Sequence, residues 1–238
     1  MSNESYPVKG RNIDLQGAYA AAEERFTSAN PKSLVQHTRA SESLPGGNTR
    51  TGMHYEPFPL AMERGEGAYM WDLDGHCYRD YAGDFSAGLY GHTNETIHAA
   101  VRDVLANGVT FGSASAHESR LASLLCERIP SIERIRFTNS GTEANIMALV
   151  TANAITARHK VMVFEGAYHG GTLSFPPDGS PINVPFDFVM APYNDISGTN
   201  AVFDEHGGDV SAILVELVQG GGGCIPATAE FVALLRER

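Results

Sequence analysis

Several features that would assign this chain to a broad class of protein are missing from its sequence. No apolar run approaches the roughly 18 residues that a membrane-spanning helix needs. The three cysteines, Cys77, Cys126 and Cys224, are widely spaced without a CxxC, which gives no zinc signature and fits free thiols in a reducing compartment. The first residues, Met1 to Ser5, are polar and show no apolar signal-peptide core. We therefore expect a cytoplasmic protein.

Positive charge is also scarce. The 238 residues hold 17 Lys and Arg against 28 Asp and Glu, a formal net charge of −11 at pH 7, which argues against nucleic acid or an anionic membrane as partner. Only Lys9, Lys32 and Lys160 are lysines. Hydrophobic residues make up 42% of the chain and charged residues 19%, so the composition is that of a protein that buries a core.

The first third of the chain predicts a helix followed by a small antiparallel sheet. Apolar residues at helical spacing mark a helix over residues 13–30, and Asn30-Pro31 ends it. Residues 57–85 alternate between strand-like runs and turns, and Asp74-Gly75 is a two-residue hairpin signal. We expect a small antiparallel meander here.

Beyond residue 92 the pattern alternates between helices and strands. Cap residues and apolar spacing predict helices over residues 94–105, 115–129, 142–157 and from 228 onward. Strand-like runs, most of them fully apolar, occupy residues 134–138, 161–164, 188–191 and 212–216. Apolar strands alternating with helices predict an α/β fold with a mostly parallel sheet buried on both faces.

Three polar or glycine-rich loops follow strands of that sheet, and the carboxyl ends of parallel strands meet at one edge. The loops are residues 138–144, 165–171 and 219–224. In the first loop, a Ser140-Gly141-Thr142 turn opens a helix. The first N–H groups of this helix lack internal partners and lie at the positive end of the helix dipole. An ordinary capped turn uses the same residue types, but three such loops together favour a phosphate site.

Five motifs in this order resemble the class III aminotransferases, which belong to the fold type I family of pyridoxal-phosphate (PLP) enzymes. They are Pro45–Arg50, Asn139–Asn145, Phe164–Gly170, Ala191–Asp195 and Val215–Gly220. The likeness runs from about Phe26 to Arg238, and the subgroup it resembles joins β-phenylalanine-type aminotransferases with glutamate-1-semialdehyde aminomutases. The segment between His169 and Pro192 looks shorter than the gating loop expected of the aminomutases, which favours the aminotransferase.

The resemblance implies a cofactor site built from two of the loops. Ser140, Gly141 and Thr142 would bind the PLP phosphate, in agreement with the helix-terminus argument. Tyr168 would stack on the pyridine ring, and His169 would help to position it. Without the resemblance, Tyr168 reads as a packing aromatic and His169 as a loop histidine with its hydrogen bonds satisfied.

Further roles implied by the resemblance concern the third loop and an arginine. Glu216 and Gln219 would lie near the cofactor at a strand end, although Glu216 also reads as a buried structural carboxylate. Leu217 stands where the family usually has proline. Arg50 would bind the substrate carboxylate, because its fork of donors suits bidentate binding; alone it reads as a surface arginine.

The resemblance also requires two groups that these residues do not supply. Family enzymes use a Schiff-base lysine and an aspartate that pairs with the pyridine nitrogen, both expected beyond Arg238, so no catalytic residue is assigned within the chain. Lys160 precedes the strand 161–164 and Tyr168 follows it. At about 3.3 Å per residue, the two ends of this strand lie more than about 10 Å apart, so Lys160 is at the opposite end from Tyr168. We expect an N-terminal portion of a longer enzyme, inactive alone.

The predicted function of the full-length protein is PLP-dependent transamination of a β-amino acid with a keto-acid acceptor, in a homodimer without a metal. Residues 1–84 would contribute to a small domain, and residues 85–238 would form the first half of the large PLP-binding domain. Two alternatives stay open at this point. One is a glutamate-1-semialdehyde 2,1-aminomutase; the other is a non-catalytic fragment that binds a phosphate ligand or a partner chain.

Overall fold

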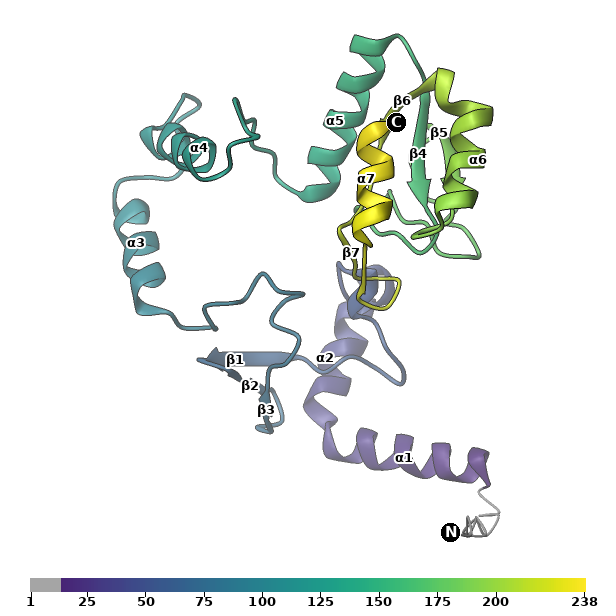
Figure 1. The fold of residues 1–238 in the computed structure, drawn as a ribbon. Helices are drawn as coiled ribbons and strands as arrows, with labels where there is room; N and C mark the ends of the chain where they lie inside the picture. The colour runs from purple at the N-terminus through teal and green to yellow at the C-terminus, as the bar shows by residue number, and fades with distance from the viewer. Residues whose placement is uncertain (1–13) are drawn as a thin grey trace, which may run out of the picture. The chain divides into compact units, whose positions relative to one another are not determined.

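The structure is a computed structural model that describes residues 14–238 (Figure 1). The chain divides into two compact units, residues 1–113 and residues 114–238, each of which is described by itself below. The predicted domain boundary after residue 84 stays a prediction. No helix in the described range has the length and apolarity needed to cross a membrane.

Two consecutive helices begin the described part of the first unit, α1 (Leu15–Ala29) and α2 (Pro31–Ser41). α1 starts where the Asp14 carboxylate accepts a hydrogen bond from the main chain of its first turn. It ends at Asn30 as predicted, but α2 then begins at once and was not predicted. Proline suits the first helical position, because the N–H that it lacks would have no partner there.

The predicted meander is confirmed as an antiparallel sheet in the order β1-β2-β3. Its strands are β1 (Met62–Glu66), β2 (Tyr69–Asp72) and β3 (Cys77–Arg79). The two-residue hairpin turn falls at Gly67-Ala68, where Gly67 has φ +55°, and not at Asp74-Gly75. Asp74 lies in a longer turn because its carboxylate caps α2, accepting from the N–H groups of Lys32 and Ser33 at 2.8 and 3.0 Å.

The rest of the first unit holds short helical turns and one long helix. The turns are η1 (Pro45–Gly47) and η2 (Thr51–Met53), and the helix is α3 (Glu95–Ala106). Asn94 caps α3 by accepting the N–H of Ile97 at 3.2 Å, in agreement with the predicted start of this helix.

The second unit is built on a parallel three-stranded sheet in the order β5-β4-β6. The strands are β4 (Lys160–Phe164), β5 (Asp187–Ala191) and β6 (Val210–Ile213), with a separate ribbon of β7 (Val218–Gln219) and β8 (Ile225–Pro226). The helices are α4 (Ala116–Arg128), α5 (Gly141–Thr156), α6 (Ile196–His206) and α7 (Ala229–Glu237), with the turn η3 (Gly207–Asp209). The α/β class is thereby confirmed.

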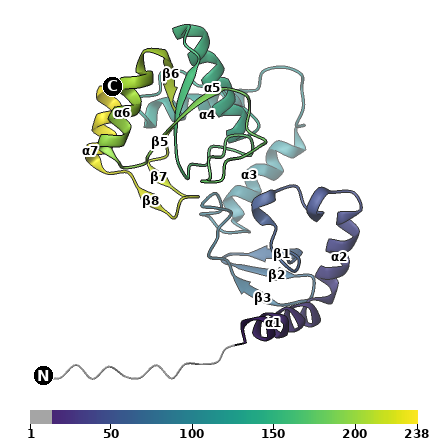
Figure 2. The ribbon, with the colours of Figure 1, turned by 90° about the vertical axis from the view of Figure 1, so that its right-hand side faces the viewer.

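Helices cover both faces of this sheet. Figure 2 shows α6 and α7 on one side and α5 on the other, and α6 contacts α7. The central strand β4 is buried from Val161 to Phe164, as its continuous apolar run predicts. Phe231 of α7 packs edge-on against Phe164 at a centroid distance of 5.2 Å, and Leu149 of α5 belongs to the same core. The sheet therefore forms a rigid base for the loops at its ends.

Residues 134–138 do not form the predicted strand. A strand needs a neighbouring strand for its hydrogen bonds, and within residues 14–238 none pairs with this segment. Arg134 and Arg136 point to solvent, so the short alternating run leads into α5 as an extended connection.

Helix α6 was not predicted; Asp195 caps it by accepting the N–H of Gly198 at 2.9 Å.

Candidate functional site

The amino end of α5 presents unfilled hydrogen-bond donors. Ser140 caps the helix, its hydroxyl accepting the N–H of Glu143 at 3.1 Å. The N–H groups of Gly141 and Thr142 form no hydrogen bond within the described part of the chain. A Cβ placed on Gly141 would meet no atom within 4 Å, so there is open space beside the first residue of the helix. Two free donors at the positive end of a 16-residue helix suit an anion.

Glu143 fixes the turn that precedes this helix. Its carboxylate accepts hydrogen bonds from the main-chain N–H of Asn139 at 2.8 Å and from the Asn139 side chain at 3.2 Å. The Thr138 hydroxyl donates to the carbonyl of Ser140 at 2.9 Å. Side chains therefore hold this turn as a variant of the capping box.

The loop after β4 is tied to the first turns of α5. Asn145 donates from its side-chain amide to the carbonyl of His169 at 2.8 Å. The N–H of Gly171 donates to the Thr142 hydroxyl oxygen at 3.1 Å, which leaves the hydroxyl proton free. Gly170 lies between these contacts with φ +135°, and a Cβ on it would stand 2.2 Å from the Thr142 hydroxyl oxygen. Only glycine fits this position.

The same loop is tied on its other side to the segment after β6. The Glu216 carboxylate accepts the N–H of Tyr168 at 3.0 Å and the N–H of Gly220 at 3.3 Å. The buried Gln219 side chain donates to the carbonyl of Glu165 at 2.7 Å. The three loops predicted to share one edge of the sheet are thus joined by hydrogen bonds.

The loop of residues 165–171 is called the clasped loop below, because hydrogen bonds hold it on both sides. Tyr168 belongs to this loop. The residue is 56% exposed, and its hydroxyl forms no hydrogen bond with any residue in the described range. Its main chain forms an isolated antiparallel bridge with Ser174. An exposed ring on a fixed main chain is not a packing aromatic of the core.

His169 is buried beside it, with 8% of its surface exposed. Burial lowers the pKa of His169, although the negative charge of Glu216 and the main chain of Leu214 oppose the shift, so the imidazole is neutral near pH 7. Its Nε2 atom has no hydrogen-bond partner among the described residues. The reading as a fully satisfied loop histidine therefore does not hold.

Leu217, where the family usually has proline, starts a turn that other contacts close. The Tyr193 hydroxyl donates to the carbonyl of Glu216 at 2.8 Å, and the N–H of Ala227 donates to the carbonyl of Leu217 at 2.9 Å. Burial, and then the charge of Glu216, raise the pKa of Tyr193, which keeps its proton on the donor oxygen. The segment is ordered without proline.

Arg50 belongs to the first unit. Its Nη1 lies 2.9 Å from Oδ1 of Asp84, and the two side chains are 64% and 52% exposed. Its main-chain N–H donates to the side chain of Asn48 at 2.9 Å. No other side-chain hydrogen bond of Arg50 occurs among residues 14–238, so most of its guanidinium donors stay available for an anion.

Lys160 lies at the opposite end of β4 from the clasped loop, as predicted. Its ammonium lies 3.4 Å from a carboxylate oxygen of Asp209 and 3.4 Å from Nδ1 of His206. In the described part of the chain, no group of three His, Cys, Asp or Glu side chains is arranged to hold a metal ion.

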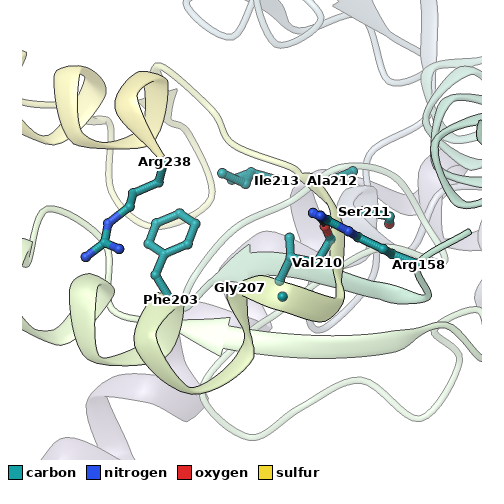
Figure 3. A pocket seen from close by; sticks show the side chains of 9 residues that line it. Arg158, Phe203, Gly207, Val210, Ser211, Ala212, Ile213 and Arg238 are labelled. Atoms are coloured by element: carbon teal, nitrogen blue, oxygen red, sulfur yellow. Dashed lines mark hydrogen bonds between the residues drawn. The ribbon is translucent and has the colours of Figure 1, made fainter. Parts of the chain in front are cut away.

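A hollow of about 590 Å³ also lies at this amino end of the sheet (Figure 3). Figure 3 shows Arg238 and Phe203 on one side of it and Arg158 on the other. Arg158 donates to the carbonyl of Val210 at 3.1 Å, and Arg238 pairs with Asp204 at 3.1 Å. The charged side chains around the hollow are therefore already partnered.

Sequence reasoning did not assign roles to Asn145 and Gly170, although both stand in the motifs that it used. The available signals were an asparagine in the first turns of a helix and a Gly-Gly pair at a loop corner. Neither signal identifies the partner residue. Asn145 contacts His169 and Gly170 contacts Thr142, and the two members of each pair are distant in the sequence.

Comparison with known proteins gives consistent matches. A family model described as aminotransferase class-III matches residues 51–238. A beta-phenylalanine transaminase of Variovorax paradoxus is 48% identical over 223 residues, which are 94% of this chain and 51% of the relative. A crystal structure of a beta-phenylalanine aminotransferase from that organism aligns with a TM-score of 0.90 at 47% identity, over 94% of this chain and 52% of the other.

A glutamate-1-semialdehyde 2,1-aminomutase of Rhodopirellula baltica is 37% identical in an alignment 227 residues long that covers 88% of this chain and 52% of the relative. The chain thus spans about half the length of the curated relatives that it matches.

Proposed function

This chain belongs to the class III aminotransferase family, and we propose from that premise that the whole protein is a PLP-dependent enzyme that transaminates a β-amino acid with a keto-acid acceptor. The observation that carries the proposal is the 48% identity over 223 residues to a β-phenylalanine transaminase, against 37% for an aminomutase. The match covers both units of the chain, so it extends beyond the common cofactor loops.

The residues at the amino end of α5 fit the phosphate of PLP. The free N–H groups of Gly141 and Thr142, with the hydroxyls of Ser140 and Thr142, supply hydrogen-bond donors at the helix terminus. Bound PLP supplies an electron sink for loss of a proton at the carbon that bears the amine. Tyr168 would lie against the ring, and the unpartnered Nε2 of His169 would take part in the hydrogen bonds around it.

Arg50 is proposed to bind the substrate carboxylate. Asp84 holds one end of its guanidinium and so limits the orientations of a long side chain before substrate arrives. The remaining donors can bind both oxygens of a carboxylate. Arg50→Ala should therefore weaken carboxylate substrates most. Equal losses on matched amines that lack a carboxylate would contradict this role.

The aminomutase is the second candidate, because such enzymes also match most of this chain. The segment after His169 supports the aminotransferase instead. Leu173 and Phe175 are buried in the core, and Ser174 and Asn183 exchange hydrogen bonds of 3.0 and 2.8 Å. A segment anchored in this way is poorly suited to open and close as a gate.

A cytosolic homodimer remains part of the proposal. The three cysteines are unpaired in the structure, in keeping with a reducing compartment. Tyr81, Phe85, Leu89 and Tyr90 of the first unit are all strongly exposed, as expected of apolar side chains that a partner subunit covers.

The test is an assay of the full-length protein with PLP, β-phenylalanine and a keto-acid acceptor. We expect one amino-acid product from the acceptor for each β-amino acid consumed, and no reaction without the acceptor. Turnover of glutamate-1-semialdehyde without any keto acid would favour the aminomutase. Binding of PLP without transfer to any acceptor would favour the non-catalytic alternative.

A further inference from the structure

The orientation of Tyr168 depends on its main chain. Its ring is exposed and its hydroxyl makes no hydrogen bond with the described residues, so no neighbouring side chain sets its direction. The main chain on both sides of it is held by side chains from other elements: Glu216 accepts the N–H of Tyr168, and Asn145 donates to the carbonyl of His169.

Glu216 differs from Asn145 because it joins two loops with one carboxylate. Its two oxygens accept the N–H groups of Tyr168 and Gly220, at 3.0 and 3.3 Å. Its own carbonyl accepts the Tyr193 hydroxyl, which anchors the residue to the core. Within the part of the chain that is described, no Lys or Arg pairs with Glu216, so the main-chain amides are the groups that stabilise its charge.

We propose that Glu216 is a positioning residue of the candidate site, acting through the main chain of Tyr168 and Gly220 and not by contact with the cofactor. The carboxylate fixes the main chain that carries the Tyr168 ring relative to the segment after β6 before any ligand arrives. This preorganisation lowers the conformational entropy that is lost when the Tyr168 ring stacks on a cofactor ring. The role toward a cofactor ring rests on the proposed function, whereas the coupling of the two loops does not.

The first test is amide hydrogen exchange on the full-length protein without PLP. It compares wild type with Glu216→Gln and Glu216→Ala. An amide side chain has one acceptor oxygen, so Gln can satisfy one of the two N–H groups and Ala neither. We expect exchange at Tyr168 and Gly220 to accelerate about tenfold in Glu216→Ala, and at one of the two positions in Glu216→Gln. Glu165→Gln, an exposed carboxylate in the same loop, is the matched control and should leave both amides unchanged.

The second test separates positioning from general destabilisation. Asn153→Ala removes a hydrogen bond with Ser211 away from the clasped loop and serves as a variant of lowered stability. With PLP bound, Glu216→Ala should change the circular dichroism induced in the cofactor band and weaken PLP binding about tenfold. Asn153→Ala should lower the melting temperature but leave both of these unchanged.

The possible outcomes distinguish the inference from the proposed function. Unaltered exchange at Tyr168 in Glu216→Ala would overturn the inference, whatever the enzyme catalyses. Equal changes in the cofactor spectrum of Glu216→Ala and Asn153→Ala would also overturn it, since both would then reflect stability alone. If wild type binds no PLP, the proposed function fails, and faster exchange at both amides would still support the coupling of the loops.

Discussion

The two ends of the parallel sheet in the second unit are both rich in polar side chains, but the partners of these side chains differ between the two ends. At the amino end, charged groups pair with one another or with the main chain: Lys160 with Asp209, and Arg238 with Asp204. At the carboxyl end, side chains bind the main chain of neighbouring loops, and donors at Gly141 and Thr142 stay unfilled.

This difference shows that a hollow is not by itself evidence of a site. The volume of about 590 Å³ in Figure 3 lies at the amino end, where the arginines around it already have partners. The carboxyl end offers free N–H groups, the unpartnered Nε2 of His169 and the exposed ring of Tyr168. A buried polar atom without a partner, such as Nε2 of His169, marks a binding site more reliably, because leaving it unsatisfied costs free energy until a ligand or water supplies the hydrogen bond.

The largest effect should come from Gly170→Ala at the carboxyl end. The new Cβ would overlap the hydroxyl oxygen of Thr142 at 2.2 Å and its Cα at 2.8 Å, and φ +135° is strained for alanine. We expect a loss of about 3 to 5 kcal/mol in unfolding free energy, or a displaced loop with PLP binding weakened more than about 100-fold. Denaturant unfolding and PLP titration measure the two.

Gly171→Ala is the matched control for this prediction. A Cβ on Gly171 would meet no atom within 4 Å, and its φ is not positive. We expect a change in stability below about 0.5 kcal/mol. A comparable loss in both variants would show that the loop is sensitive to any substitution, and that the contact between Gly170 and Thr142 is not special.

A smaller effect is expected from Thr142→Val, which removes the oxygen that accepts the N–H of Gly171 and the proton available to a phosphate. PLP affinity should fall about tenfold or more, while Thr142→Ser should keep most of it because the hydroxyl remains. Titration with pyridoxal, which lacks the phosphate, separates the two roles: a loss confined to PLP assigns the hydroxyl to the phosphate. Equal affinity of the Val and Ser variants for PLP would contradict both roles.

The sequence predicted the parallel sheet and the loops at its carboxyl edge better than it predicted some of the other elements. Strand β4 and the loop after it follow from a continuous apolar run, and parallel strands bring their carboxyl ends together whatever the details of the loops. Pro31 was read as a helix stop because proline has that effect inside a helix, but the same residue begins α2. Residues 134–138 have strand propensity, yet strand formation depends on a partner that propensity does not specify.

The links between loops could not be predicted, since each joins residues that are far apart in the chain. Glu216 reaches Tyr168 and Asn145 reaches His169 across 48 and 24 residues. A motif shows that such residues occur together, but the donor and acceptor atoms become known only from the folded main chain.

A pH experiment extends the comparison to His169. Because burial lowers its pKa, the folded state binds this proton less well than the unfolded state, whose histidine titrates near pH 6.5. The stability contributed by neutral His169 is thus present above that pH and is lost as pH falls through it, by at most about 1.4 kcal/mol per pH unit. His169→Gln should lose less stability than wild type between pH 7 and 5, measured by denaturant unfolding.

The exposed His159 of the same unit provides the control, because solvent surrounds it in both states. His159→Gln should follow the wild-type pH dependence. If His169→Gln also follows it, the pKa of His169 is the same in the folded and unfolded states, and the prediction that burial lowers it would be wrong.

The smallest effect should come from Lys160→Met at the amino end. The ion pair with Asp209 is 3.4 Å long and its carboxylate side chain is 72% exposed, so solvent screens it and its loss should cost no more than about 0.5 kcal/mol. PLP affinity and the spectrum of the bound cofactor should match wild type, because Lys160 precedes β4 whereas Tyr168 follows it. Loss of covalent PLP capture in this variant, at unchanged stability, would place the cofactor at the amino end and reverse the comparison between the two ends of the sheet.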